Sequence, residues 1–151
     1  MAIKDALATF ADNYDLDQEA ATFLLTSQMD LGAAGNDPGN GVPVYLNVAV
    51  EETFTDGGDA ATLQLLLVSD DTASIHATTR TVHFASGLIL KAALTIGKRF
   101  SFPIPVSGTP YERYLGVQAI VATAGFDAGE ITAWLGLEPI ADVKTYPDGA
   151  H

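Results

Sequence analysis

Three histidines are the side chains of this sequence best suited to acid–base or metal chemistry, and their spacing does not bring them together. His76 and His83 fall in one predicted strand, Ser74–His83, an odd number of residues apart. Because successive side chains of a strand point to opposite faces, these two imidazoles cannot share a metal ion without a distant third ligand. His151 is the last residue of the sequence. For His83, between Val82 and Phe84, we expect a partly buried, hydrogen-bonded ring instead of a metal ligand.

Carboxylates are numerous and occur as adjacent pairs or in turns. The pairs are Glu51-Glu52 and Asp70-Asp71, and the acidic turns contain Asp56 with Asp59 and Asp127 with Glu130. A glycosidase needs two carboxyl groups across a groove, one of them kept protonated by burial, whereas adjacent acids at strand ends are usually solvated. The sequence also contains neither a G-x-S-x-G nucleophile motif nor a G-x-x-x-x-G-K-[ST] phosphate loop. We therefore expect no enzyme and no cofactor, although a weak calcium site at one of these acidic turns stays open.

Aromatic side chains are the remaining candidates, because exposed rings can stack on sugars or anchor a protein interface. The four candidates are Tyr111, Tyr114, Trp134 and Tyr146. Trp134 alternates with the core-type residues Ala133 and Leu135. We therefore expect its ring to face away from the core and to be available as an anchor.

Composition and charge narrow the class of protein. A chain of 151 residues suits one domain with a sizeable core, and the absence of cysteine excludes disulfides and thiolate metal sites. The formal net charge of −12 repels nucleic acid phosphate and anionic lipid, so we expect neither as a partner. We find no signal-peptide pattern, and the apolar runs are shorter than the ~18 residues that a membrane helix needs. We expect a soluble protein.

Eight segments have the apolar alternation or β-rich composition of strands, and turn-rich sequence separates them. They are Thr22–Met29, Pro43–Glu52, Ala61–Ser69, Ser74–His83, Gly87–Ala92, Lys98–Ile104, Arg113–Thr123 and Glu130–Leu137. This spacing predicts an all-β fold, a two-sheet jelly-roll-like sandwich of about eight antiparallel strands. Pro103 and Pro105 cannot donate to a central ladder, so we expect their segment at a sheet edge.

The domain organisation predicted from these segments is a central sandwich with an extended arm at each end. Residues 1–20 form an N-terminal arm and acidic linker, residues 21–138 the β-sandwich domain, and residues 139–151 a C-terminal tail. Within the arm, Ala2–Ala11 has helical spacing, with Ile3, Leu7 and Phe10 on one side. A helix this short is marginal in water, so it needs a docking surface on its own domain or on a neighbour.

An ordered set of short motifs runs through nearly the whole chain. These are Met1–Ala6, Met29–Ala33, Gly41–Leu46, Phe102–Pro105, Arg113–Leu115 and Glu130–Leu135. In this order and spacing the set resembles the capsid cement (decoration) proteins of tailed bacteriophages, whose cement subunit is a jelly-roll domain on the outside of the head. The acidic stretch Asp12–Glu19 departs from that pattern.

The resemblance implies a structural role without catalysis. Such a subunit, typically a homodimer, binds across neighbouring major capsid protein subunits on the outer surface of the virion and stabilises the expanded shell against internal DNA pressure. It would be made in the host cytoplasm. From expected exposure we predict capsid contacts at Ile3, Leu7, Phe10, Tyr111, Arg113, Tyr114 and Tyr146.

Two other functions are weighed against this one. A carbohydrate-binding jelly-roll module, with or without calcium, would use the exposed aromatic rings and acidic turns. A sugar-active enzyme is disfavoured, because the histidines are dispersed and no convergent carboxylate pair is evident.

Overall fold

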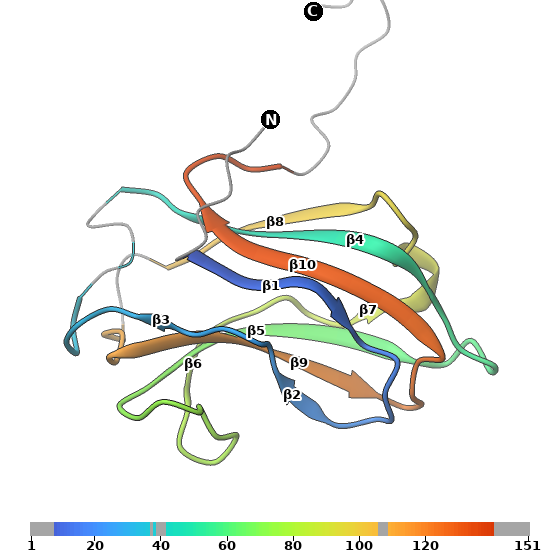
Figure 1. The fold of residues 1–151 in the computed structure, drawn as a ribbon, viewed down its shortest axis with the longest axis horizontal. Coiled ribbons are helices and arrows are strands. Elements are labelled where there is room, and N and C mark those ends of the chain that lie inside the picture. The colour runs from blue at the N-terminus through green and yellow to red at the C-terminus, as the bar shows by residue number, and fades with distance from the viewer. Residues whose placement is uncertain (1–7, 37, 39–41, 106–108, 141–151) are drawn as a thin grey trace, which may run out of the picture.

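The computed structural model describes residues 8–36, 38, 42–105 and 109–140, and these form a sandwich of two antiparallel sheets (Figure 1). The upper sheet has the strand order β1 (Thr9–Asp15), β10 (Ala128–Gly136), β4 (Tyr45–Thr55) and β8 (Arg99–Pro103). The lower sheet has the order β2 (Thr22–Leu24), β9 (Tyr114–Ala122), β5 (Thr62–Asp70) and β6 (Thr81–Ala85). Two short strands extend it, since β3 (Met29–Asp30) pairs with β9 and β7 (Ile89–Leu90) pairs with β5. A 3-10 turn, η2 (Lys91–Ala93), follows β7.

The chain order of these strands is that of a jelly roll. The first and last strands, β1 and β10, are neighbours, and most consecutive long strands lie in opposite sheets, such as β4 and β5 or β9 and β10. The chain therefore crosses between the sheets several times, and most neighbouring strands within a sheet are distant in sequence. The predicted all-β, two-sheet sandwich is confirmed.

The core lies between the inner faces of the two sheets. Alternate residues of the central strands supply it, as the period of two predicts. Those from β4, β5, β9 and β10 are Leu46, Val48, Val50, Leu63, Leu65, Leu67, Val117, Ala119, Val121, Ile131, Ala133 and Leu135. At one end Phe54 packs edge-on against Phe126, with ring centroids 4.8 Å apart. Gly129 lies beside this pair at a φ of +149°, and a Cβ there would be 2.5 Å from the Phe54 ring, so only glycine fits.

The N-terminal region differs from the prediction. Thr9–Asp15 is strand β1, paired with β10, so the second half of the expected helix and the first half of the expected linker belong to the sandwich. The reason is burial against β10, because Phe10 and Ala11 are 1% and 2% exposed. The rest of that helix, up to Leu7, lies outside the described residues.

Three predicted strands are shorter than expected. Thr22–Met29 contains β2 and only the start of β3, and Gly87–Ala92 contains only β7 before the chain turns into η2. Of Ser74–His83, only Thr81–His83 is strand. Residues 74–80 form a loop, and Ile75 in it packs on the outer face of the lower sheet against Leu66 and Val68. Because the loop covers this outer face, Ile75 is buried although residues 74–80 are not paired as a strand.

The structure tests the predicted edge position of the proline-containing segment and the predicted exposure of Trp134. β8, which ends at Pro103, is the edge of the upper sheet as predicted. Trp134 does face away from Ala133, but it is 6% exposed, so the prediction of an exposed anchor is wrong. On this outer face the described part of the C-terminal tail folds back, since Asn47 Nδ2 donates to the Glu138 carbonyl and the Ile140 N–H donates to Ser101 Oγ.

No helix within the described ranges is long and apolar enough to span a membrane.

Candidate interaction site

The chain enters the first strand and leaves the last one at the same end of the sandwich. Thr9 of β1 pairs with Trp134 of β10, so Ala8 and Leu137 come close to each other there (Figure 1). An apolar hollow of about 320 Å³ lies at this place. Its lining residues are Ala8, Met29, Pro38, Val44, Leu135, Gly136 and Leu137. We call this region, together with β3, residues 111–113 and Tyr114 at the start of β9, the terminal end.

Tyr111 lies at the terminal end but is not available to a partner. Its side chain is 6% exposed, its hydroxyl donates to the Pro105 carbonyl, and its ring lies 4.2 Å from that of His83. The Tyr111 carbonyl accepts a hydrogen bond from the Gly35 N–H at 2.6 Å. The residue therefore ties two loops to the lower sheet, and the exposure expected from the sequence is wrong.

Arg113 and Tyr114 do reach the surface. The Arg113 guanidinium donates from Nε to Asp30 Oδ1 and from its terminal nitrogen to Asp30 Oδ2, both at 3.0 Å. Hydrogen bonds from Arg113 and then from the Gly32 N–H lower the pKa of Asp30. The guanidinium also lies 5.1 Å from the Tyr114 ring centroid. This half-exposed ion pair joins β3 to the residue just before β9 and leaves a planar cation at the terminal end.

The other predicted contact residues divide into two groups. Phe10 is a core residue, so a partner could reach it only if β1 left the sheet. Ile3, Leu7 and Tyr146 lie outside the described residues. Of the seven predicted contacts, the structure brings Tyr111, Arg113 and Tyr114 together at the terminal end.

A polar cluster that no sequence motif indicates lies beneath Tyr111. Ser69 Oγ lies 2.7 Å from His83 Nε2 and accepts a hydrogen bond from the Glu112 N–H at 3.1 Å. Burial lowers the pKa of His83, which favours the neutral ring. Ser69 is fully buried, so a substrate has no access to its hydroxyl. The cluster holds the Tyr111–Glu112 segment against β5 and β6, and the expected partly buried, hydrogen-bonded His83 is confirmed.

Comparison with protein families gives one match that spans most of the sandwich. The model of the Bbp16 family matches residues 17–135. The chain belongs to the Bbp16 family. A search of curated proteins finds no match. The Bbp16 match contains the whole lower sheet and β4 and β8 of the upper sheet, and it ends within β10.

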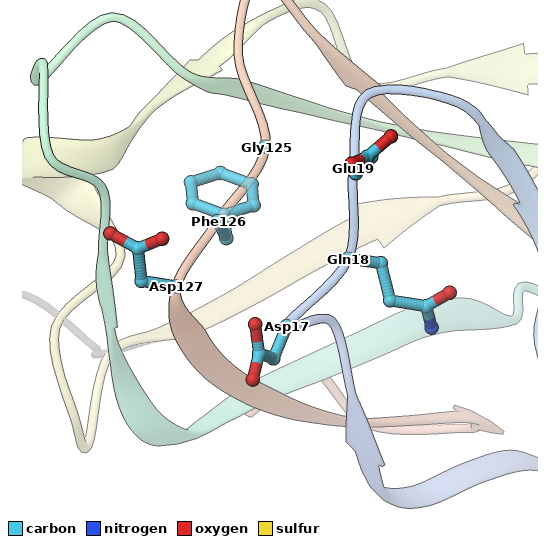
Figure 2. Close-up of a pocket in the computed structure, with 6 residues that line it drawn as sticks. All are labelled: Asp17, Gln18, Glu19, Gly125, Phe126 and Asp127. Carbon is cyan, nitrogen blue, oxygen red and sulfur yellow. The ribbon is translucent and has the colours of Figure 1, made fainter.

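The Bbp16 match begins in an acidic region at the end of the sandwich opposite the terminal end. A shallow hollow of about 360 Å³ lies there, lined by Asp17, Gln18, Glu19, Gly125, Phe126 and Asp127. Figure 2 shows the three carboxylates of this hollow pointing in different directions. Gly125 allows the close approach of the two segments, because a Cβ there would lie 2.7 Å from the Gln18 carbonyl oxygen. The hollow therefore has negative charge but no converging ligand set.

The acidic turns considered for calcium are held by the protein's own donors. Asp56 accepts hydrogen bonds from the N–H groups of Gly58, Ala60 and Ala61, and these bonds lower its pKa. Asp70 accepts from the hydroxyl of Thr79, which is the main cause of its lowered pKa. Among the described residues, no three His, Cys, Asp or Glu side chains are grouped to hold a metal ion. These carboxylates therefore stabilise their own turns by accepting hydrogen bonds from nearby residues.

Proposed function

We propose that this Bbp16-family protein is a structural virion protein. It binds the outside of the capsid of a tailed bacteriophage as a cement, or decoration, protein and stabilises contacts between major capsid protein subunits. It is made in the host cytoplasm and associates as a homodimer on the shell, and neither nucleic acid nor membrane is among its partners. The ordered motifs described above, with the jelly-roll sandwich that their resemblance implies, support this proposal.

The observation that carries the proposal is the construction of the terminal end. An apolar hollow lies where the chain enters β1 and leaves β10, and Leu137 beside it is 67% exposed. The Arg113–Asp30 pair and Tyr114 add a planar cation and an aromatic ring close by, the kinds of side chain that contribute most to protein interfaces. A surface of this kind, with two chain ends next to it, suits attachment to a neighbouring subunit.

Co-sedimentation tests the proposal. Purified protein is mixed with expanded phage heads that lack it, and the heads are then heated with and without the protein. We expect saturable binding in a fixed ratio to the major capsid protein and a raised temperature of head disruption. Heads that sediment without the protein at every concentration would reject the proposal.

The carbohydrate-binding alternative relies on exposed aromatic rings. Of its four candidate rings, Tyr111 and Trp134 are buried, Tyr114 reaches the surface and Tyr146 lies outside the described residues. Retention on a polysaccharide column, or a rise in melting temperature on adding calcium, would revive it.

A further inference from the structure

The acidic residues of this chain are distributed very unevenly. Of the nineteen Asp and Glu residues, none lies between Asp71 and Glu112. The same stretch contains four of the seven basic residues, Arg80, Lys91, Lys98 and Arg99. A strongly acidic protein therefore contains one long segment that is basic and apolar.

The fold gathers the second half of this segment on one lateral side of the sandwich. β6 is an edge strand of the lower sheet and β8 is the edge of the upper sheet opposite β1 (Figure 1). The two edges meet through aromatic rings, since Phe84 of β6 and Phe102 of β8 have centroids 5.1 Å apart. β7 and η2 connect them along the chain. We call this side, made of β6, β7, η2 and β8 with the turns that join them, the acid-free edge.

Large apolar side chains are exposed along the acid-free edge. Val82, Leu88, Leu90 and Ile96 are 45–68% exposed, and they are four of the six most exposed large hydrophobic residues of the described chain. The other two, Val42 and Leu137, lie at or beside the terminal end. Exposed apolar side chains that gather in one region mark interaction sites.

The cations of the acid-free edge are of two kinds. Arg80 donates to Gln118, and Lys91 pairs with Asp59, so these two are already engaged within the fold. The side chains of Lys98 and Arg99 are exposed and make no hydrogen bond or ion pair with the described residues, although Lys98 Nζ lies 5.9 Å from the Phe100 ring centroid. Two unpaired cations next to exposed aliphatic side chains fit a surface on which carboxylates surround apolar residues.

We infer that the acid-free edge is a second docking surface, and that it binds a shell subunit through an acidic surface with aliphatic side chains. This inference rests on the proposed function, in which the protein binds across neighbouring shell subunits, and it adds a contact to the one at the terminal end. The charges of Lys98 and Arg99 favour an acidic partner over a second copy of this edge. Pairing this edge with itself across a two-fold axis would place Lys98 and Arg99 of both copies in one interface, where they repel.

The test compares variants in binding to expanded heads that lack the protein. Lys98→Gln with Arg99→Gln removes the two free cations, and we expect on the order of tenfold weaker binding in low salt. Leu88→Ser with Leu90→Ser keeps the charge and removes apolar area, with an expected loss of about tenfold or more at any salt concentration. Thr22→Glu with Thr26→Glu is the matched control. It lowers the net charge by the same amount as the glutamine pair, at exposed positions on the other side of the sandwich, and should bind like the parent chain.

The outcomes separate the two proposals. If the parent chain does not bind heads, both the proposed function and this inference fail. If the parent binds and all three variants bind equally well, the function stands and the acid-free edge is not the contact. If the control pair weakens binding as much as the glutamine pair, overall charge is the cause and the inference is wrong. Concentration-dependent self-association that the glutamine pair abolishes would assign the edge to a second copy and would also overturn it.

Discussion

The two edges of the upper sheet are built in opposite ways. β1 pairs irregularly with β10, with register shifts after Thr9 and after Ala11, and Asn13 has a positive φ of 49°. β8 pairs with β4 over five consecutive positions without a shift, from Tyr45–Pro103 to Ala49–Arg99. Bulges and charges are common ways to prevent edge strands from pairing with other chains. The β1 edge is thus blunted, and the β8 edge is left regular.

Charge follows the same division. Asp12 and Asp15 lie on β1, and Asp15 is in register with Glu130, which in turn faces Glu52 on β4. Arg99 is the first residue of β8, and Lys98 directly precedes it. A single sheet therefore has one acidic, irregular edge and one basic, regular edge. Of these two lateral edges, the β8 edge therefore fits a protein partner better than the β1 edge does.

The largest effect is expected from Phe10→Ala on the β1 side. Phe10 is 1% exposed, so its loss leaves a cavity and should lower the free energy of unfolding by about 3–5 kcal/mol. Urea denaturation measures it, with Phe10→Leu as a milder control. Unchanged stability together with lost head binding would mean that Phe10 is a contact residue after all, and that β1 is not fixed in the sheet.

A smaller loss is expected from Phe102→Ala on the β8 side. Phe102 is only partly buried, between Phe84 and Phe100, so about 1–3 kcal/mol of stability should be lost. A double-mutant cycle with Phe84→Ala should give a coupling of about 0.5–1.5 kcal/mol, because the two rings touch across the sheets. Additive losses would show that β6 and β8 do not form one side.

The pH dependence of stability reports on His83, which lies on the same side as β8. Burial lowers its pKa in the folded protein below the ordinary value of 6.5. Above pH 6.5 the ring is neutral in both the folded and the unfolded chain, so protonation of His83 does not lower the stability there. Below that pH the unfolded chain takes up the proton first, and stability falls until the pH drops below the folded pKa.

His83→Gln should therefore flatten the stability profile just below pH 6.5. The carboxylates with lowered pKa values, Asp30, Asp56 and Asp70, act only at lower pH, because their ordinary value is 3.8. A slope that persists in His83→Gln would show that another group causes it.

The smallest effect is expected from Glu130→Gln. Glu130 has Asp15 on one side and Glu52 on the other, and like charges in register across strands repel. Removing the middle charge should raise stability by a few tenths of a kcal/mol at low ionic strength. The gain should vanish in about 1 M salt, where the screening length is near 3 Å. A gain independent of salt would have a cause other than charge.

Much of the fold could be predicted because the central strands are regular. β5, β9 and β10 are long and almost wholly buried, with apolar residues at alternate positions facing the core, and their predicted ranges agree with the structure within a few residues. β1 was missed because its bulges interrupt the alternation in TFADNYD. Residues 74–80 do not form the predicted strand, because Ile75 is buried by folding back over a sheet, which sequence periodicity does not distinguish from pairing.

The candidate site was less predictable, since it depends on long-range contacts. Tyr111 is buried by Pro105 and by His83, and no local pattern announces the contact with a strand so far away in sequence. The acid-free stretch between Asp71 and Glu112 is visible in the sequence. Only the fold shows that much of this stretch lies on one side of the sandwich, because its strands β6 and β8 belong to different sheets.

Cysteine protection tests most directly which side of the sandwich meets the shell. The chain has no cysteine, so Leu90→Cys on the acid-free edge and Thr22→Cys on β2 each give one reactive thiol. Both side chains are exposed, so both variants should react with a small alkylating reagent when free in solution. Bound to heads, Leu90→Cys should become protected while Thr22→Cys keeps its reactivity. Protection of Thr22→Cys with full reactivity of Leu90→Cys would contradict the account.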